Sequence, residues 1–193
     1  MAVPLTARRI FAACLILGLA WATGFGCQSA QEPAGGKVNK FRQAVLAHLQ
    51  KAKAQLGPLA SPEKREELMA AMRKLYDETG GTGGNLPCGL GVLDQGGVVL
   101  AGGYPDPQAP GGVAVVSGGK NYSQYDKVKQ VVKGRDNSHF TLYTTDGKVY
   151  MICSPLNDGG RARGAVCLAF FGDTLNDELG VSDKDFAALD FNS

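Results

Sequence analysis

The first stretch of chain after residue 36 alternates apolar and polar positions at helical spacing. Apolar residues recur every three or four positions from Val38 to Leu56, so they line one face of a helix. A glycine-proline pair at 57–58 ends that helix. A second helix begins at Ser61, whose hydroxyl can cap it, and ends at Gly80. The pattern therefore predicts two helices at the start of the folded region.

After residue 80 the apolar residues gather in short runs separated by turn residues, which is typical of strands. The pair Asp146-Gly147 between runs rich in Tyr, Thr, Val and Ile predicts a hairpin. In order, we expect strands at 86–93 and 98–101, a loop at 104–112 with a brief strand at 113–116, a helix at 122–133, strands at 140–145, 148–154 and 164–171, and a short acidic helix at 183–189. Five antiparallel strands with helices on one side make an α+β domain.

Glycine makes up 27 of the 193 residues, and 21 of these lie between Gly80 and Gly180. The chain has no G-X-Y period, which excludes a glycine-rich fibre, and no glycine pair continues into a phosphate-binding or dinucleotide-binding motif. We therefore expect most of these glycines to serve as turn residues with positive φ.

The N-terminal 26 residues have the pattern of an export signal. Arg8 and Arg9 precede an uncharged run of 13 residues at 10–22, which is too short to span a membrane. Small residues before Cys27 resemble the bacterial lipobox, in which the cysteine becomes the lipidated first residue of the mature protein. We predict a signal peptide of lipoprotein type at 1–26, lipidation at Cys27, a linker at 27–36 and a single domain at 37–193.

Two other outcomes stay open for this N-terminus. An ordinary signal peptidase could cut nearby and leave a soluble periplasmic protein with a free Cys27, or the apolar run could remain as an uncleaved anchor. Every one of these outcomes places the folded part outside the cytoplasm, on the periplasmic face of a bacterial membrane.

The charge distribution constrains the partners. Without Arg8 and Arg9 the chain carries 18 basic and 18 acidic residues, and no basic patch with interleaved aromatics points to nucleic acid. Residues 37–60 carry basic side chains and no acidic ones, whereas residues 172–193 carry six acids and one lysine. The basic segment either rests on anionic lipid headgroups or forms a solvated helix face.

Three cysteines remain in the folded region, Cys88, Cys153 and Cys167, so at most one internal disulfide can form. If strands 149–155 and 164–171 pair antiparallel, Cys153 and Cys167 lie roughly opposite each other, near disulfide range. Cys88 competes if its strand borders the last one, and all three could instead be small core residues. The chain has no C-x-x-C motif, which argues against thioredoxin-like chemistry.

Four segments together resemble a Cache domain, the extracytoplasmic PAS-like sensor module of bacteria. They are GVLDQGGVVLA at 91–101, NYSQY at 121–125, DGKVYMICSP at 146–155 and GAVCLAF at 164–170. The resemblance covers roughly residues 37–172 and implies a five-stranded antiparallel sheet in the order 2-1-5-4-3, with the N-terminal helices packed on it. It also implies a small-molecule pocket between the sheet and the segment at 104–133.

The residues that we expect at this pocket combine aromatic and polar side chains. Tyrosines supply apolar walls with a hydroxyl group, and an arginine can bind a carboxylate with two hydrogen bonds, as in an organic acid or an amino acid. The predicted ligand-binding residues are Tyr104, Tyr122, Tyr125, Arg135, Tyr143 and Ser154.

Residue patterns typical of catalysis are scarce. We expect His48 and His139 at the surface, and the chain contains no zinc-protease, serine-hydrolase or phosphate-loop motif. We therefore predict no catalytic activity, no cofactor and no metal. A thiol-redox enzyme would need a reactive Cys88 with a low pKa.

These observations favour a lipid-anchored periplasmic Cache-like module that binds a small molecule and works with a sensor kinase or a chemoreceptor. The alternative is a structural or interaction lipoprotein that has a PAS-like fold without a pocket and partners a membrane receptor or envelope protein. A space closed by Val and Leu favours the alternative, and a concave site with convergent polar groups favours the sensor.

Overall fold

The computed structural model describes residues 34–78, 86–145 and 147–192, which all belong to one compact unit, Glu32–Ser193. The predicted signal peptide at 1–26, Cys27 and most of the linker at 27–36 lie outside the described residues. None of the helices in the described ranges combines the length and the apolar character needed to cross a membrane.

Two helices open the described chain, as the apolar periodicity predicts. Helix α1 (Ala34–Leu56) ends in a 3-10 turn, η1 (Gly57–Leu59). A second 3-10 turn, η2 (Pro62–Lys64), leads into α2 (Arg65–Glu78). Ser61 stands at the predicted N-cap, but its hydroxyl makes no capping hydrogen bond. The proline that follows suits the first helical position, where its missing N–H costs no hydrogen bond.

The strands follow in the predicted order. Strands β1 (Gly89–Asp94) and β2 (Val99–Pro105) form a hairpin, and the 3-10 turn η3 (Pro110–Gly112) precedes β3 (Val113–Ser117). The chain continues through α3 (Asp126–Lys133), β4 (Ser138–Thr144), β5 (Gly147–Asp158), β6 (Arg161–Phe171), a π-helical turn η4 (Thr174–Glu178) and α4 (Asp183–Ala188).

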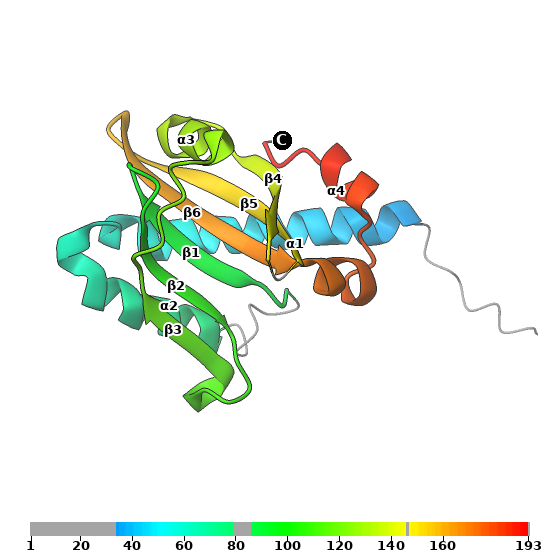
Figure 1. Cartoon of the computed structure of the whole chain (residues 1–193), viewed down its shortest axis with the longest axis horizontal. Helices are drawn as coiled ribbons and strands as arrows, with labels where there is room; N and C mark the ends of the chain where they lie inside the picture. Colours follow the sequence, from blue (N-terminus) through cyan, green and yellow to red (C-terminus); the bar gives the residue numbers. More distant parts are fainter. Residues whose placement is uncertain (1–33, 79–85, 146, 193) are drawn as a thin grey trace, which may run out of the picture. The chain divides into compact units, whose positions relative to one another are not determined.

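The described strands form one antiparallel sheet in the order β3-β2-β1-β6-β5-β4 (Figure 1). Without β3 this is the predicted order 2-1-5-4-3, so the α+β fold class and the strand order are confirmed. The sheet is six-stranded instead of five-stranded because the brief strand expected at 113–116 pairs with β2, from Ala101↔Ser117 to Pro105↔Val113.

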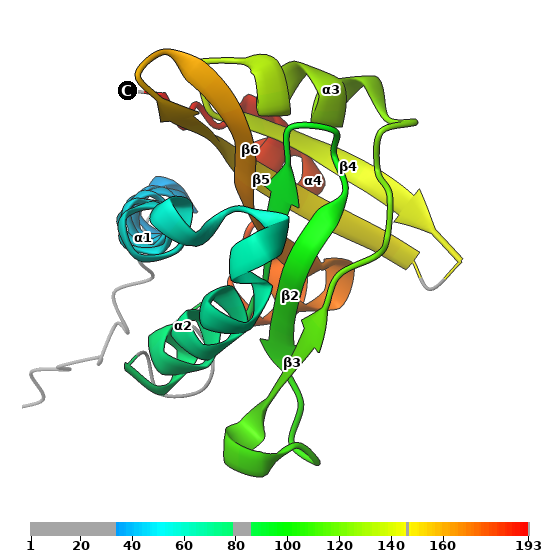
Figure 2. The ribbon, with the colours of Figure 1, turned by 90° about the vertical axis from the view of Figure 1, so that its left-hand side faces the viewer.

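Helices cover both faces of the sheet, which corrects the expectation that they all lie on one side. Figure 2 shows α1 and α2 on one face and α3 on the other. The main core lies between α1, α2 and the sheet, and a second, smaller core lies under α3. Because side chains alternate along a strand, neighbouring residues of β5 belong to different cores: Ile152 lies in the main core and Cys153 in the second.

The C-terminal segment closes one end of the main core. The ring centroid of Phe186 in α4 lies 4.9 Å from that of Tyr150 in β5, and Phe191 is also buried. Arg42 of α1 donates a hydrogen bond to the backbone carbonyl of Asp190. This hydrogen bond joins the first half of α1 to the C-terminal segment.

Candidate functional site

The two faces of the sheet are covered to different extents. On the face of α1 and α2, the side chains of Leu90, Val92, Ile152 and Leu168 are all buried. On the opposite face, α3 packs on β4, β5 and β6. α3 reaches β1 at Leu93, and among the described residues no helix packs on the rest of the face formed by β1, β2 and β3, where the sheet can meet another molecule.

The space under α3 is filled by protein side chains. Val128, Val131 and Val132 of α3 pack on Leu93, Phe140, Leu142 and Ala165 of the sheet. Cys153 and Cys167 lie directly opposite each other in β5 and β6 and form a disulfide in this core, with their Cα atoms 4.0 Å apart. The space directly under α3, which is part of the region where the resemblance implies a pocket, is thus filled by apolar side chains.

The uncovered part has a floor of glycine. Gly91 in β1 is paired with Gly102 of β2 on one side and with Cys167 of β6 on the other. Gly89 lies two residues before Gly91 and therefore on the same face of the strand. A Cβ atom added at Gly91 would meet no other atom within 4 Å. We call Gly89, Gly91 and Gly102 the glycine strip. Because these positions carry no side chain, a bound molecule can approach the sheet backbone there.

Exposed apolar side chains surround the glycine strip. Tyr104 of β2 is 44 % exposed, Val116 of β3 is 45 % exposed and Phe171 at the end of β6 is 56 % exposed. Tyr104 lies on this face because its neighbour Gly103 faces α2, where an added Cβ would lie 2.7 Å from a ring carbon of Tyr76. The arrangement offers an open apolar surface with an aromatic ring, which suits a molecule with an apolar part.

Three of the predicted ligand-binding tyrosines lie on this side of the sheet. The rings of Tyr122 and Tyr125, just before α3, have centroids 6.1 Å apart and pack half-buried against the second core. Tyr104 stands at the glycine strip. These three tyrosines therefore share one face of the sheet.

Ser154 and Tyr143 lie on the opposite face. The Ser154 hydroxyl is buried and accepts a hydrogen bond from Nζ of Lys53 in α1, at 3.3 Å. Tyr143 follows Leu142, which belongs to the second core, so its side chain points away from α3 and is 74 % exposed. The structure does not bring these two residues together with the other three tyrosines, because strand neighbours alternate between faces.

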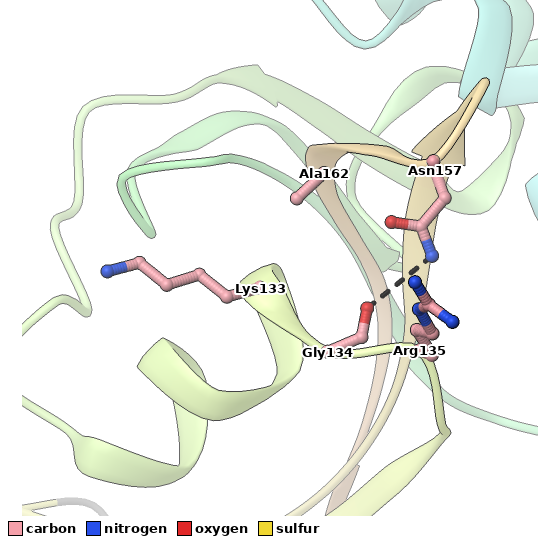
Figure 3. Close-up of a pocket in the computed structure, with 6 residues that line it drawn as sticks. Lys133, Gly134, Arg135, Asn157 and Ala162 are labelled. Atoms are coloured by element: carbon pink, nitrogen blue, oxygen red, sulfur yellow. Dashed lines mark hydrogen bonds between the residues drawn. The ribbon is translucent and has the colours of Figure 1, made fainter.

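Arg135 lines a hollow at the β5–β6 hairpin, which encloses about 340 Å³ (Figure 3). The side-chain nitrogen of Asn157 donates a hydrogen bond to the carbonyl of Gly134 at 3.4 Å, next to the Arg135 guanidinium, while the Lys133 side chain points the other way. The hollow reaches β6 at Ala162, whereas the glycine strip meets β6 at 167–169. Arg135 therefore stands at a different place from Tyr104.

A second hollow of about 470 Å³ lies on the other side of the same hairpin, against the end of α1. Lys53 of α1 lines it, and across it Arg163 forms an ion pair with Asp158 at 2.9 Å. Asn157 lines both hollows, so the hairpin separates one polar depression from the other.

The two histidines and the free cysteine in the described residues lie in packed surroundings. His48 is buried on the apolar face of α1, which corrects the expectation of a surface histidine. Its pKa is lowered mainly by burial and in addition by the positive charge of Lys51. His139 lies half-buried against the rings of Phe186 and Phe191. Burial raises the pKa of the Cys88 thiol to about 12, so it carries no thiolate at neutral pH. The described residues contain no cluster of three or more His, Cys, Asp or Glu side chains that could hold a metal ion.

Sequence reasoning missed the glycine strip and its neighbours Val116 and Phe171. It assigned the glycines of this region mainly to turns, and Gly97 and Gly147 do have positive φ. The available signal was the spacing of Gly89 and Gly91 by two positions within a predicted strand, which leaves one face of that strand without side chains.

Comparison with known proteins supports the fold. No protein-family model and no curated protein matches the chain. Among solved structures, the ligand-binding domain of the Campylobacter jejuni chemoreceptor Tlp3 in complex with L-valine is similar, with a TM-score of 0.57, 10 % identity, and coverage of 76 % of this chain and 58 % of that chain. A domain of a sensory box/GGDEF family protein from Vibrio parahaemolyticus is also similar, with a TM-score of 0.52, 12 % identity, and coverage of 79 % and 61 %.

The chain therefore spans about three fifths of the length of these structures. It shares the α+β fold of these two sensory domains, so the fold that the sequence predicts is confirmed.

Proposed function

We propose that this protein is a sensory module that binds a small molecule at the glycine strip and does not transform it chemically. One observation carries the proposal. Among the described residues, a fold shared with ligand-binding sensory domains leaves part of one sheet face uncovered, with a glycine floor and the exposed side chains of Tyr104, Val116 and Phe171 around it. Such a surface gives a ligand apolar contact area and access to the backbone.

The ligand class that we propose is an amino acid or an organic acid with an apolar part. Two similar solved domains, both of the chemoreceptor Tlp3, hold L-valine and isoleucine. An aliphatic side chain of this size would lie over the glycine strip against Tyr104.

In the cell, we place the module on the periplasmic face of a bacterial membrane. The signal pattern at 1–26 and the lipobox-like Cys27 support export and lipid anchoring, and the domain would be residues 37–193. A separate sensor kinase or chemoreceptor would then read the ligand-bound state.

The test is a thermal-shift screen of the full-length chain with amino acids and organic acids. For a compound that raises the melting temperature, Tyr104→Ala should reduce the shift, because Tyr104 borders the strip. The matched control is Tyr143→Ala, which removes an exposed tyrosine from the opposite face and should leave the shift unchanged. Equal shifts in both variants would contradict a site at the strip, and Arg135→Ala reports separately on the hairpin hollow.

A second candidate is a structural or interaction lipoprotein without a ligand. The filled space under α3, with Val128, Val131 and Val132 at its centre, favours it. In that case no compound in the screen stabilises the chain, and filling the strip with Gly91→Leu leaves its cellular role unchanged.

A further inference from the structure

The edge of the sheet at β3 is open in the part of the chain that the structure describes. β3 stands last in the strand order and pairs only with β2. Figures 1 and 2 show it at the margin of the sheet, with α2 against one face. An edge strand of this kind presents backbone groups to which another strand can pair.

The hydrogen-bond pattern identifies the groups that point outward. Gly118 N–H donates to the carbonyl of Leu100 at 3.0 Å, and Asp106 N–H donates to the carbonyl of Gly112 at 2.9 Å. These bonds mark the hydrogen-bonded pairs of the β2–β3 ladder, which recur at every second residue. The N–H and C=O groups of Val113, Val115 and Ser117 therefore point to the free edge.

This edge lacks the protection that natural sheets usually carry. β3 has the sequence VAVVS, with no charged residue, no proline and three β-branched valines. Edge strands that stay unpaired commonly contain lysine, proline or a bulge. At the other edge, the start of β4 is engaged by the C-terminal segment, since Asn192 accepts a hydrogen bond from Asn137 N–H and donates one to its carbonyl.

We propose that β3 pairs antiparallel with β3 of a second copy of this chain, about a two-fold axis at Val115. The outward groups at 113, 115 and 117 are symmetric about this residue, so Val113 faces Ser117 of the partner subunit and every outward N–H meets an outward C=O. A strand without charge brings no like charges together when it pairs with itself.

The side chains on the exposed face fit the same register. Val116 of one copy comes opposite Ala114 of the partner subunit, with Tyr104 one strand beyond that alanine. A row across the joint sheet thus reads Gly102, Val116, then Ala114 of the partner subunit and Tyr104 of the partner subunit, so small and large side chains alternate. The pairing covers Val116, which is 45 % exposed in one copy.

The first test is the oligomeric state of the full-length chain, measured by light scattering in mild detergent across a dilution series. We expect a dimer at about 100 μM chain. Val116→Lys changes an exposed position and places two positive charges near the two-fold axis, one from each copy. We expect it to raise the dissociation constant of the dimer by about tenfold or more. The matched control is Phe171→Lys, another exposed apolar residue of the same sheet face but on β6, and it should leave the dimer intact.

Crosslinking tests the register independently of the lysine variants. Val116→Cys should form a covalent dimer with a short bismaleimide in intact cells, because the two 116 positions are diagonal neighbours across the axis. Phe171→Cys should not, and wild type reports the background, since Cys88 is buried and the other two described cysteines form a disulfide. A wild-type chain that stays monomeric at every concentration, or a dimer unaffected by Val116→Lys, overturns the proposal.

Discussion

At the level of single residues, Gly103 marks a close approach between α2 and the sheet. An added Cβ would lie 2.7 Å from a ring carbon of Tyr76 and 3.1 Å from the sulfur of Met72. The Tyr76 hydroxyl also donates to the carbonyl of Gly103, at 2.9 Å, within the buried interface. The contact leaves no room for a side chain at 103.

We therefore expect Gly103→Ala to lower the free energy of unfolding by about 1–3 kcal/mol, because the packed ring and thioether must move. Urea denaturation measures this change. Gly102→Ala is the matched control, since its Cβ would meet no atom closer than 3.8 Å, and it should change stability little. Equal losses in both variants would show that α2 does not pack as described.

His48 links stability to pH. Burial and the charge of Lys51 lower its pKa in the folded state, so below pH 6.5 the unfolded chain takes up a proton that the folded chain resists. The free energy of unfolding should therefore fall as pH drops from 7 to 5, by at most about 1.4 kcal/mol per pH unit from this residue. Urea denaturation at several pH values measures the slope.

His48→Gln keeps a polar side chain at this position without the titration. Between pH 7 and 5 its slope should be smaller than that of wild type. Carboxylates with lowered pKa values, such as Asp183 beside Lys148, lose their stabilising charge only in more acidic solution. A variant with the wild-type slope would contradict the role of His48.

At the level of elements, α4 and the residues after it cover one end of the main core. Phe186 is 2 % exposed and packs on Tyr150. We expect Phe186→Ala to lower the free energy of unfolding by about 3–5 kcal/mol, because it leaves a cavity. Phe171→Ala removes the same ring from a position that is 56 % exposed and should cost far less. Thermal or urea unfolding of the two variants gives the comparison. Similar losses of unfolding free energy would contradict a packing role for Phe186 at the end of the main core.

The disulfide joins β5 and β6 beneath α3. Its cysteines are separated by 14 residues, and a closed loop of this length corresponds to about 3 kcal/mol through restriction of the unfolded chain. We expect the double variant Cys153→Ala, Cys167→Ala to lose about that much in urea denaturation. Cys88→Ala serves as the control for removing a buried thiol that is not in a disulfide, and a double variant as stable as this control would contradict the expected contribution.

The elements that sequence reasoning predicted well are those defined by local chemistry. The hairpin that the Asp146-Gly147 pair predicts is present, because β4 and β5 pair from Thr144↔Gly147 to Ser138↔Cys153. The helices at both ends follow from apolar periodicity and turn residues. Strand order was reached through the resemblance to a family and not through any single segment.

The candidate site was harder to predict because it depends on which residues face each other. Ser154 and Cys153 are neighbours in sequence, yet one contacts α1 and the other lies under α3. Nothing local to β5 indicates which face α3 covers. The glycine strip exists only once β1 and β2 pair in the register Gly91↔Gly102, a contact between distant positions.

At the level of the whole molecule, lipid anchoring predicts where the protein is found. Wild type should fractionate with membranes and carry an added lipid mass on Cys27, and Cys27→Ser should release the chain or block its processing. Membrane fractionation with mass spectrometry of the mature N-terminus measures both. A wild-type chain that is soluble and unmodified would favour cleavage by an ordinary signal peptidase.

Helix α1 runs from the C-terminal segment to the β5–β6 hairpin. Its first turns lie beside Gly180, where an added Cβ would be 3.5 Å from the side chain of Lys37, and its last turn borders the β5–β6 hairpin at Leu156. The helix has 23 residues and is therefore about 34 Å long. A chain that enters at the start of α1 therefore joins this unit beside the C-terminal segment, and the hairpin hollows lie at the other end of the helix, about this length away.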